Sequence, residues 1–258
     1  MSLTKRVIDK IKNSVISERR RLPRYEIGNS DQIKAFFSIA GVKAYLGDRP
    51  DAPEHEHTII NLSNGGISLF LLDNEDPYFF KQNQNITLKL NIEGQKLVIP
   101  CRISYVLAGL KRLGLRFTEV TDEQMALISR FLDIRFLASS IKEVPVKERG
   151  GTCENCRWFH GQNSTDLFSW RTPEGEYKQH LFIFGNEAVE WTKRYGLQTG
   201  TMDRPDFALT YTILFSKEPN SISLDETIDA SKVEKVSSIL KLSNIDPDLK
   251  EHFFGILA

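Results

Sequence analysis

Two short groups of residues in the N-terminal half of the chain carry side chains suited to binding a nucleotide. Arg20 and Arg24 are spaced as Arg-x-x-x-Arg, and further along Asn61, Ser63 and Gly66 are spaced as Asn-x-Ser-x-x-Gly. An arginine fork donates two parallel hydrogen bonds, which suits phosphate oxygens and also the O6/N7 edge of guanine. An asparagine amide both accepts and donates, and a glycine leaves room for close approach and permits a positive φ. A ligand that carries both guanine and phosphate would use all of these groups.

Basic charge is concentrated in the first 24 residues. Eight lysines and arginines stand against two carboxylates there, a local charge of +6, although the whole chain has a net charge of zero. This excess predicts an anionic partner for the segment. The balanced total argues against a general nucleic-acid binder, so we expect no DNA partner. Taken alone, Arg19–Arg24 is more typical of a solvated basic linker, and Asn61–Gly66 of an ordinary corner between a strand and a turn.

The two groups lie in a region of short, partly alternating apolar segments separated by turn signals such as Asn64-Gly65-Gly66. Several short strands at this spacing favour a small antiparallel barrel or sandwich. The fold class we predict is mainly β plus α+β. The strands expected in this region are Lys34–Val42, Thr58–Ile60, Ile67–Leu72, Ile86–Leu90, Lys96–Tyr105 and Leu113–Phe117.

Two helices are expected around this barrel. Residues 2–17 have the apolar spacing of a basic amphipathic helix, which would pack on its own protein, on a second copy in a homodimer, or weakly on a membrane surface. The second helix begins after the capping box Thr121-Asp122-Glu123-Gln124. It should close one end of the barrel through one apolar face, formed by Ile128, Phe131, Leu132 and Phe136.

In this order, the elements resemble the PilZ domain family. The resemblance depends on an arginine-rich segment that ends in Arg20-x-x-x-Arg24 and on a strand that ends in Asn61-x-Ser63-x-x-Gly66. A small barrel with the strand Leu113–Phe117 and a closing helix follow, as they do in PilZ domains. The resemblance covers about residues 18–140.

This resemblance implies that the region binds the bacterial second messenger cyclic di-GMP. The two spaced arginines would grip phosphates and guanine edges and stack on the bases. Asn61 and Ser63 would hydrogen-bond a guanine, and Arg19 would influence whether one ligand or a stacked pair binds. A PilZ-fold adaptor with little nucleotide binding is the alternative. The ligand-binding residues that the family resemblance implies are Arg19, Arg20, Arg24, Asn61, Ser63 and Gly66.

The C-terminal half resembles no family that we identify, and its function is open. Charged residues with a Pro and a Gly-Gly pair predict a linker over 141–152, followed by an α+β domain over 153–258. Its expected elements are a hairpin of Leu167–Trp170 and Tyr177–Phe184, a helix at Asn186–Arg194, a strand at Asp206–Phe215, and helices at Lys232–Leu242 and Pro247–Leu257.

Cysteine spacing leaves a second kind of site open. Cys153-x-x-Cys156 with His160 and His180 offers up to four nitrogen and sulfur donors, the number that zinc takes. The same pair could serve thiol redox chemistry, although the βαβ context of that motif is missing. Plain packing is the third interpretation, and we expect no metal.

The sequence as a whole predicts a receptor or effector, not an enzyme. We expect cyclic di-GMP to change its conformation and the second domain to pass this change to a protein partner. No apolar run approaches the ~20 residues that span a bilayer, and three cysteines suit a reducing compartment. A cytoplasmic protein without a transmembrane segment is therefore expected.

Overall fold

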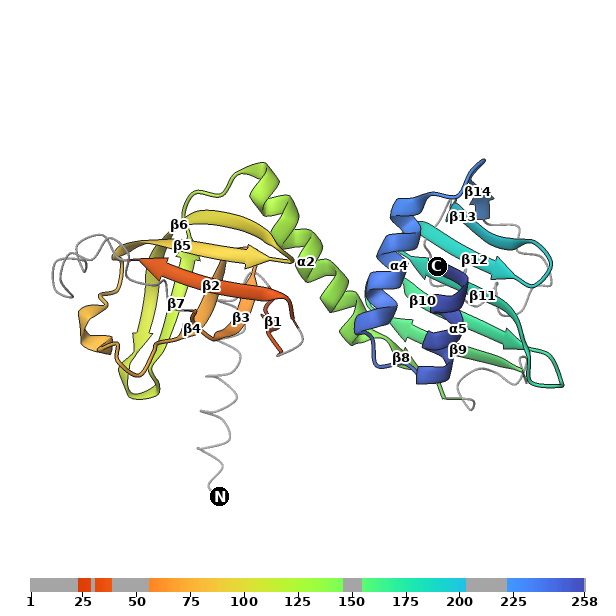
Figure 1. The fold of residues 1–258 in the computed structure, drawn as a ribbon, viewed down its shortest axis with the longest axis horizontal. Coiled ribbons are helices and arrows are strands. Elements are labelled where there is room, and N and C mark those ends of the chain that lie inside the picture. The colour runs from red at the N-terminus through yellow and green to blue at the C-terminus, as the bar shows by residue number, and fades with distance from the viewer. Residues whose placement is uncertain (1–22, 29–30, 39–55, 146–154, 203–221, 258) are drawn as a thin grey trace, which may run out of the picture. The chain divides into compact units, whose positions relative to one another are not determined.

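The computed structural model describes residues 23–28, 31–38, 56–145, 155–202 and 222–257. The predicted helix at 2–17, the arginines Arg19 and Arg20, Cys153 and the predicted strand at Asp206–Phe215 lie outside these residues. The chain divides into two compact units, residues 1–132 and 133–258 (Figure 1).

The first unit contains a seven-stranded antiparallel sheet with the order β1-β3-β4-β7-β6-β5-β2. All six strands predicted from the sequence are present, and β1 adds a short edge strand that the pattern did not reveal. The strands are β1 Tyr25–Glu26, β2 Ile33–Ser38, β3 Ile59–Ser63, β4 Gly66–Phe70, β5 Asn85–Ile92, β6 Gln95–Leu107 and β7 Arg112–Phe117. Two single turns of 3-10 helix, η2 Pro77–Phe79 and η3 Ala108–Leu110, interrupt the connections.

This sheet curls into a half-barrel (Figure 1), and the residues buried inside it are mainly apolar. Its free edge, β2, meets the residues before β3 through an isolated bridge between Ala35 and His57. The inward row Leu62, Ile67 and Leu115 is at most 3% exposed. Because side chains alternate along a strand, the residues next to this row point outward. The predicted small barrel is confirmed.

Helix α2, Asp122–Ser140, starts at the predicted capping box. The Thr121 N–H donates to the Gln124 side chain, and the Gln124 N–H donates to the Thr121 hydroxyl, both at 3.2 Å. Ile128, Phe131 and Leu132 on the predicted face are buried in the first unit. The helix continues past Leu132 without a break, so its C-terminal half belongs to the second unit.

The second unit is a seven-stranded antiparallel sheet in which every strand pairs with its sequence neighbours. Helices α4, Ala230–Leu242, and α5, Pro247–Leu257, cover one face (Figure 1). Residues 142–143, placed in the predicted linker, form its first strand. The strands are β8 Lys142–Glu143, β9 Cys156–Gly161, β10 Thr165–Arg171, β11 Tyr177–Phe184, β12 Glu187–Thr192, β13 Gly196–Met202 and β14 Ile222–Leu224.

The predicted helix at Asn186–Arg194 is wrong, because this segment is strand β12. Its Glu and Ala residues favour a helix, but glycines with positive φ turn the chain on both sides, Gly185 at 63° and Gly196 at 74°. Ala188 and Val189 are both buried, since each face of the sheet is covered at this point. Covered faces remove the alternation that identifies a strand from sequence. The predicted hairpin and the two C-terminal helices are confirmed.

A pair of histidines connects strand β11 with helix α5 in the second unit. His180 is fully buried, its Nε2 lies 3.0 Å from Nδ1 of His252, and the Trp191 ring stacks against it. Burial lowers the pKa of His180 to about 3, helped by the nearby His252 and Arg171. Burial also lowers the pKa of His252. Both side chains are therefore neutral at physiological pH.

We predict that acid destabilises this unit well above the range where carboxylates titrate. Below pH ~6.5 the unfolded chain binds a proton at His180 that the folded chain does not, so unfolding becomes easier as pH falls. The stability is intact above this value and should drop by about 2 kcal/mol by pH 5. Urea denaturation at pH 7 and pH 5 measures the loss. His180→Phe, which keeps a ring in the cluster, should reduce the pH dependence; an unchanged slope would contradict the assignment.

Candidate ligand-binding site

Three of the predicted site residues lie on the outer face of the half-barrel, where β3 turns into β4. Leu62 points into the core, so its neighbours Asn61 and Ser63 on β3 point outward. Ser63 pairs with Gly66, and its hydroxyl donates to the Gly66 carbonyl at 3.2 Å across the turn. The Asn64 side chain in the same turn accepts a hydrogen bond from Ser129 of α2 at 3.3 Å. This bond ties the turn to the closing helix.

Gly66 is required by the packing of the strands. A Cβ built on Gly66 would overlap the carbonyl oxygen of Leu115 and lie 3.2 Å from the Arg116 Cα on strand β7. Gly66 is not among the glycines with positive φ, so the conformational freedom expected from the sequence is not used here. The glycine instead allows β4 and β7 to approach closely and keeps the outer face free of a side chain.

Arg24 lies at the edge of the same face. It immediately precedes β1, whose Tyr25 pairs with Leu62 and whose Glu26 pairs with Asn61. Continuing this register by one residue places Arg24 opposite Ser63. Arg24 is exposed and makes no hydrogen bond or ion pair with the described part of the chain. Its guanidinium is therefore not engaged by any hydrogen bond or ion pair within the described residues, and its role in binding stays a prediction.

Of the six residues predicted to bind the ligand, four are described and gather at this corner of the sheet. The other two, Arg19 and Arg20, lie outside the described residues, and their positions stay predictions. The corner combines an amide, a hydroxyl and a guanidinium; Arg24 is exposed, Asn61 is half-buried and Ser63 is 6% exposed. These groups donate and accept hydrogen bonds, which is suited to recognition of a base and a phosphate.

The three described residues of the alternative zinc site do not converge. Register pairs His180 with Ser169, and Ser169 with Arg157, so His180 shares the face of Arg157. Cys156 and His160 alternate with Arg157 on β9 and point to the opposite face. Among the residues that the structure describes, no three His, Cys, Asp or Glu side chains are grouped to hold a metal ion.

Each of these residues also has a structural partner. His160 and Trp158 both hydrogen-bond Asp166 Oδ1, at 2.8 Å, and His180 bonds His252. Cys156 is a buried member of the apolar cluster on the second face. The packing interpretation therefore fits the three described residues, while the thiol pair with Cys153 lies partly outside the described chain.

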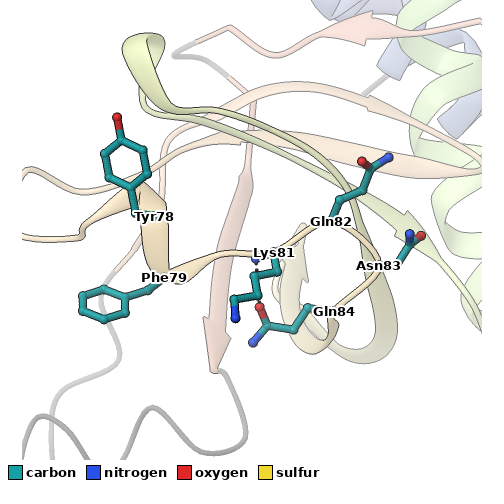
Figure 2. A pocket seen from close by; sticks show the side chains of 6 residues that line it. All are labelled: Tyr78, Phe79, Lys81, Gln82, Asn83 and Gln84. Carbon is teal, nitrogen blue, oxygen red and sulfur yellow. Dashed lines mark hydrogen bonds between the residues drawn. The ribbon is translucent and has the colours of Figure 1, made fainter.

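An open pocket that the sequence analysis missed lies next to the start of β5. Figure 2 shows its lining, and its volume is about 670 Å³. Tyr78 and Phe79 are 81% and 57% exposed, and the Lys81 N–H donates to the Gln84 side chain. The lining holds none of the predicted site residues. The residues that line it are Tyr78, Phe79, Lys81, Gln82, Asn83 and Gln84.

Comparison with known proteins places the candidate corner inside a recognised domain. Residues 18–133 match the family model of the PilZ domain, which confirms the resemblance drawn from the sequence. The matched range contains all six predicted binding residues. No curated protein gives a match to the chain.

Solved structures with similar folds include two PilZ domains and one further protein in complex with c-di-GMP. The PilZ domain of YcgR from Escherichia coli, with c-di-GMP, is 17% identical, with a TM-score of 0.33, over 45% of this chain and 89% of that chain. The PilZ domain of CeSA from a cellulose-synthesizing bacterium is 16% identical, with a TM-score of 0.30, over 43% of this chain and 95% of that one. The Borreliella burgdorferi PlzA protein in complex with c-di-GMP is 10% identical, with a TM-score of 0.29, over 90% of this chain and 98% of its own. Because these scores are low, we base a function on the family match and the site residues.

Within the described residues, no helix is both long enough and apolar enough to cross a membrane.

Proposed function

We propose that this chain is a receptor for cyclic di-GMP. The observation that carries the proposal is that the region matching the PilZ family model contains the corner of the sheet where the candidate residues gather. The PilZ match spans the corner where Asn61 and Ser63 point outward from β3 and Arg24 precedes the adjacent edge strand. A dinucleotide with two guanines and two phosphates uses an amide, a hydroxyl and guanidinium forks together.

Each residue has a role in this proposal. Arg20 and Arg24 bind phosphates and guanine edges and stack on the bases. Asn61 hydrogen-bonds a guanine. The Ser63 hydroxyl already donates to the Gly66 carbonyl, so it accepts a hydrogen bond from the guanine. Gly66 keeps the surface flat at the point of contact. Arg19, next to this pair of arginines, sets whether one ligand or a stacked pair is bound.

Charge neutralisation drives the binding. The first 24 residues carry a net charge of +6, which two ligand phosphates reduce. Charge-assisted hydrogen bonds between the arginines and the phosphates contribute about 1.5–3 kcal/mol each.

A change in the first unit on ligand binding would reach the second unit through helix α2. Asn64 of the site turn bonds Ser129 of this helix, and the same helix contributes Leu137 and Ala138 to the core of the second unit. A change at the turn thus has a continuous helix along which to act. We propose that the second unit passes the change to a protein partner. The receptor is proposed to be cytoplasmic, since its three cysteines suit a reducing compartment, and to have no catalytic activity.

Isothermal titration of the full chain with cyclic di-GMP, GMP and ATP tests the proposal. We expect saturable binding of cyclic di-GMP and at least a hundredfold weaker binding of the two mononucleotides, because neither brings two guanines and two phosphodiesters to the corner. Equal binding of all three would leave only a general anion surface. Small-angle scattering with and without saturating ligand tests the conformational part, and superimposable curves would contradict it.

A further inference from the structure

A pair of arginines lies directly beside the candidate corner, on the same face of the sheet. Strands β4, β7, β6 and β5 follow one another in the half-barrel (Figure 1). Register pairs Gly66 with Arg116 of β7, Arg116 with Arg102 of β6, and Arg102 with Asn85 of β5. Directly paired residues of antiparallel strands share a face. The row that begins at Ser63 therefore continues outward through both arginines.

The pairing of Arg116 with Arg102 is electrostatically unfavourable in the free protein. Like charges directly opposite each other on neighbouring strands destabilise a sheet. Arg102 has only a long hydrogen bond of 3.4 Å from its Nε to Asn85, and Arg116 is exposed with no hydrogen bond or ion pair to the described residues. The two guanidinium charges thus face each other across β6 and β7 without an opposite charge between them.

Carboxylates are missing from the positions that could balance this pair. The direct partners, Gly66 and Asn85, are uncharged. The residues two positions away on the four strands, which are the diagonal neighbours, include no Asp or Glu: they are Asn64, Ser68, Gly114, Thr118, Pro100, Ser104, Asn83 and Thr87. The nearest carboxylate by register on the other side of the corner is Glu26, which pairs with Asn61.

We propose that Arg102 and Arg116 form an additional phosphate-binding subsite for the dinucleotide held at the corner. This inference rests on the proposed function. Strand spacing separates Ser63 from Arg116 by roughly 10 Å and Arg116 from Arg102 by about 5 Å. Two guanidinium forks at the second spacing can hold one phosphodiester between them through charge-assisted hydrogen bonds. The bound phosphate also removes the repulsion between the forks, so the same pair is unfavourable without ligand and favourable with it.

Calorimetric titration of cyclic di-GMP into Arg102→Ala, Arg116→Ala and the double variant tests this subsite. Each single variant should bind roughly ten- to a hundredfold more weakly, with a smaller dependence on salt. Arg116→Lys keeps the charge but loses the fork, so it should fall between wild type and Arg116→Ala. Lys96→Ala is the matched control, because Lys96 is an exposed cation on the same strand and face as Arg102, toward the other end of β6.

The thermal midpoint of the ligand-free protein provides a second readout. Removing either arginine relieves repulsion, so the midpoint should stay unchanged or rise while affinity falls. If the arginines had a purely structural role, their removal would lower both the thermal midpoint and the affinity for cyclic di-GMP. If wild type binds cyclic di-GMP and all three alanine variants bind within twofold of it, the subsite is wrong and the proposed function stands. If wild type does not bind, the proposed function fails and the subsite with it.

Discussion

Replacing Arg24 with alanine is expected to weaken binding of cyclic di-GMP at least a hundredfold. Arg24 is placed by register opposite Ser63, and its guanidinium has no partner among the described residues. A bidentate contact with a phosphate or with a guanine edge contains two charge-assisted hydrogen bonds, each worth about 1.5–3 kcal/mol. Isothermal titration measures the loss.

The fold should be unaffected by this substitution, since the side chain is exposed and makes no hydrogen bond or ion pair with a described neighbour. Arg194→Ala is the control, because Arg194 is an exposed arginine of the second unit, next to Tyr195. It should bind the ligand as wild type does. An Arg24→Ala protein that binds within threefold of wild type would remove Arg24 from the site and leave the arginine spacing without a function.

Gly66→Ala is expected to have the second large effect, and it should act on stability as well as on binding. The added methyl group would overlap the Leu115 carbonyl of β7, which is backbone and cannot rotate away. Relief requires β4 to separate from β7, and overpacking of this kind costs roughly 1–3 kcal/mol or more. The same shift would move Ser63, which bonds the Gly66 carbonyl. Differential scanning calorimetry should show the first unit melting at a lower temperature, and titration should show a loss of affinity.

Gly109→Ala serves as the comparison for this prediction. Gly109 lies in η3, and a Cβ built there meets no atom within 4 Å. Its stability and affinity should match those of the wild type. A Gly66→Ala protein with an unchanged melting temperature would show that the strands can part at no cost, and the structural reason given for this glycine would be wrong.

The sequence pattern was sufficient to predict most of the barrel. The alternation of apolar and polar residues identified the strands that correspond to β2 to β7. The capping residues Thr121 and Gln124 identified the start of α2. These signals are local, so a sequence carries them directly. The outward orientation of Asn61 and Ser63 came from the structure, because strand β3 continues through Ser63 and buries Leu62 between them.

Features that depend on distant strands were not predictable in this way. The pairing of Arg102 with Arg116 depends on the register of β6 and β7, which shifts between Ile103 and Tyr105. The need for Gly66 depends on how close β7 lies, and β12 was taken for a helix because both of its faces are covered. In each case, the cause is a contact between segments far apart in sequence, which residue spacing does not encode.

Hydrogen exchange of the full chain with and without saturating cyclic di-GMP tests the central claim most directly, because it locates the ligand on the chain. We predict slower exchange at residues 24–28, 60–68 and 112–118, where β1, β3, β4 and β7 surround the corner, and no change at 177–192 in the second sheet. Protection confined to the second unit, or none in the first at a ligand concentration that saturates binding, would contradict the site.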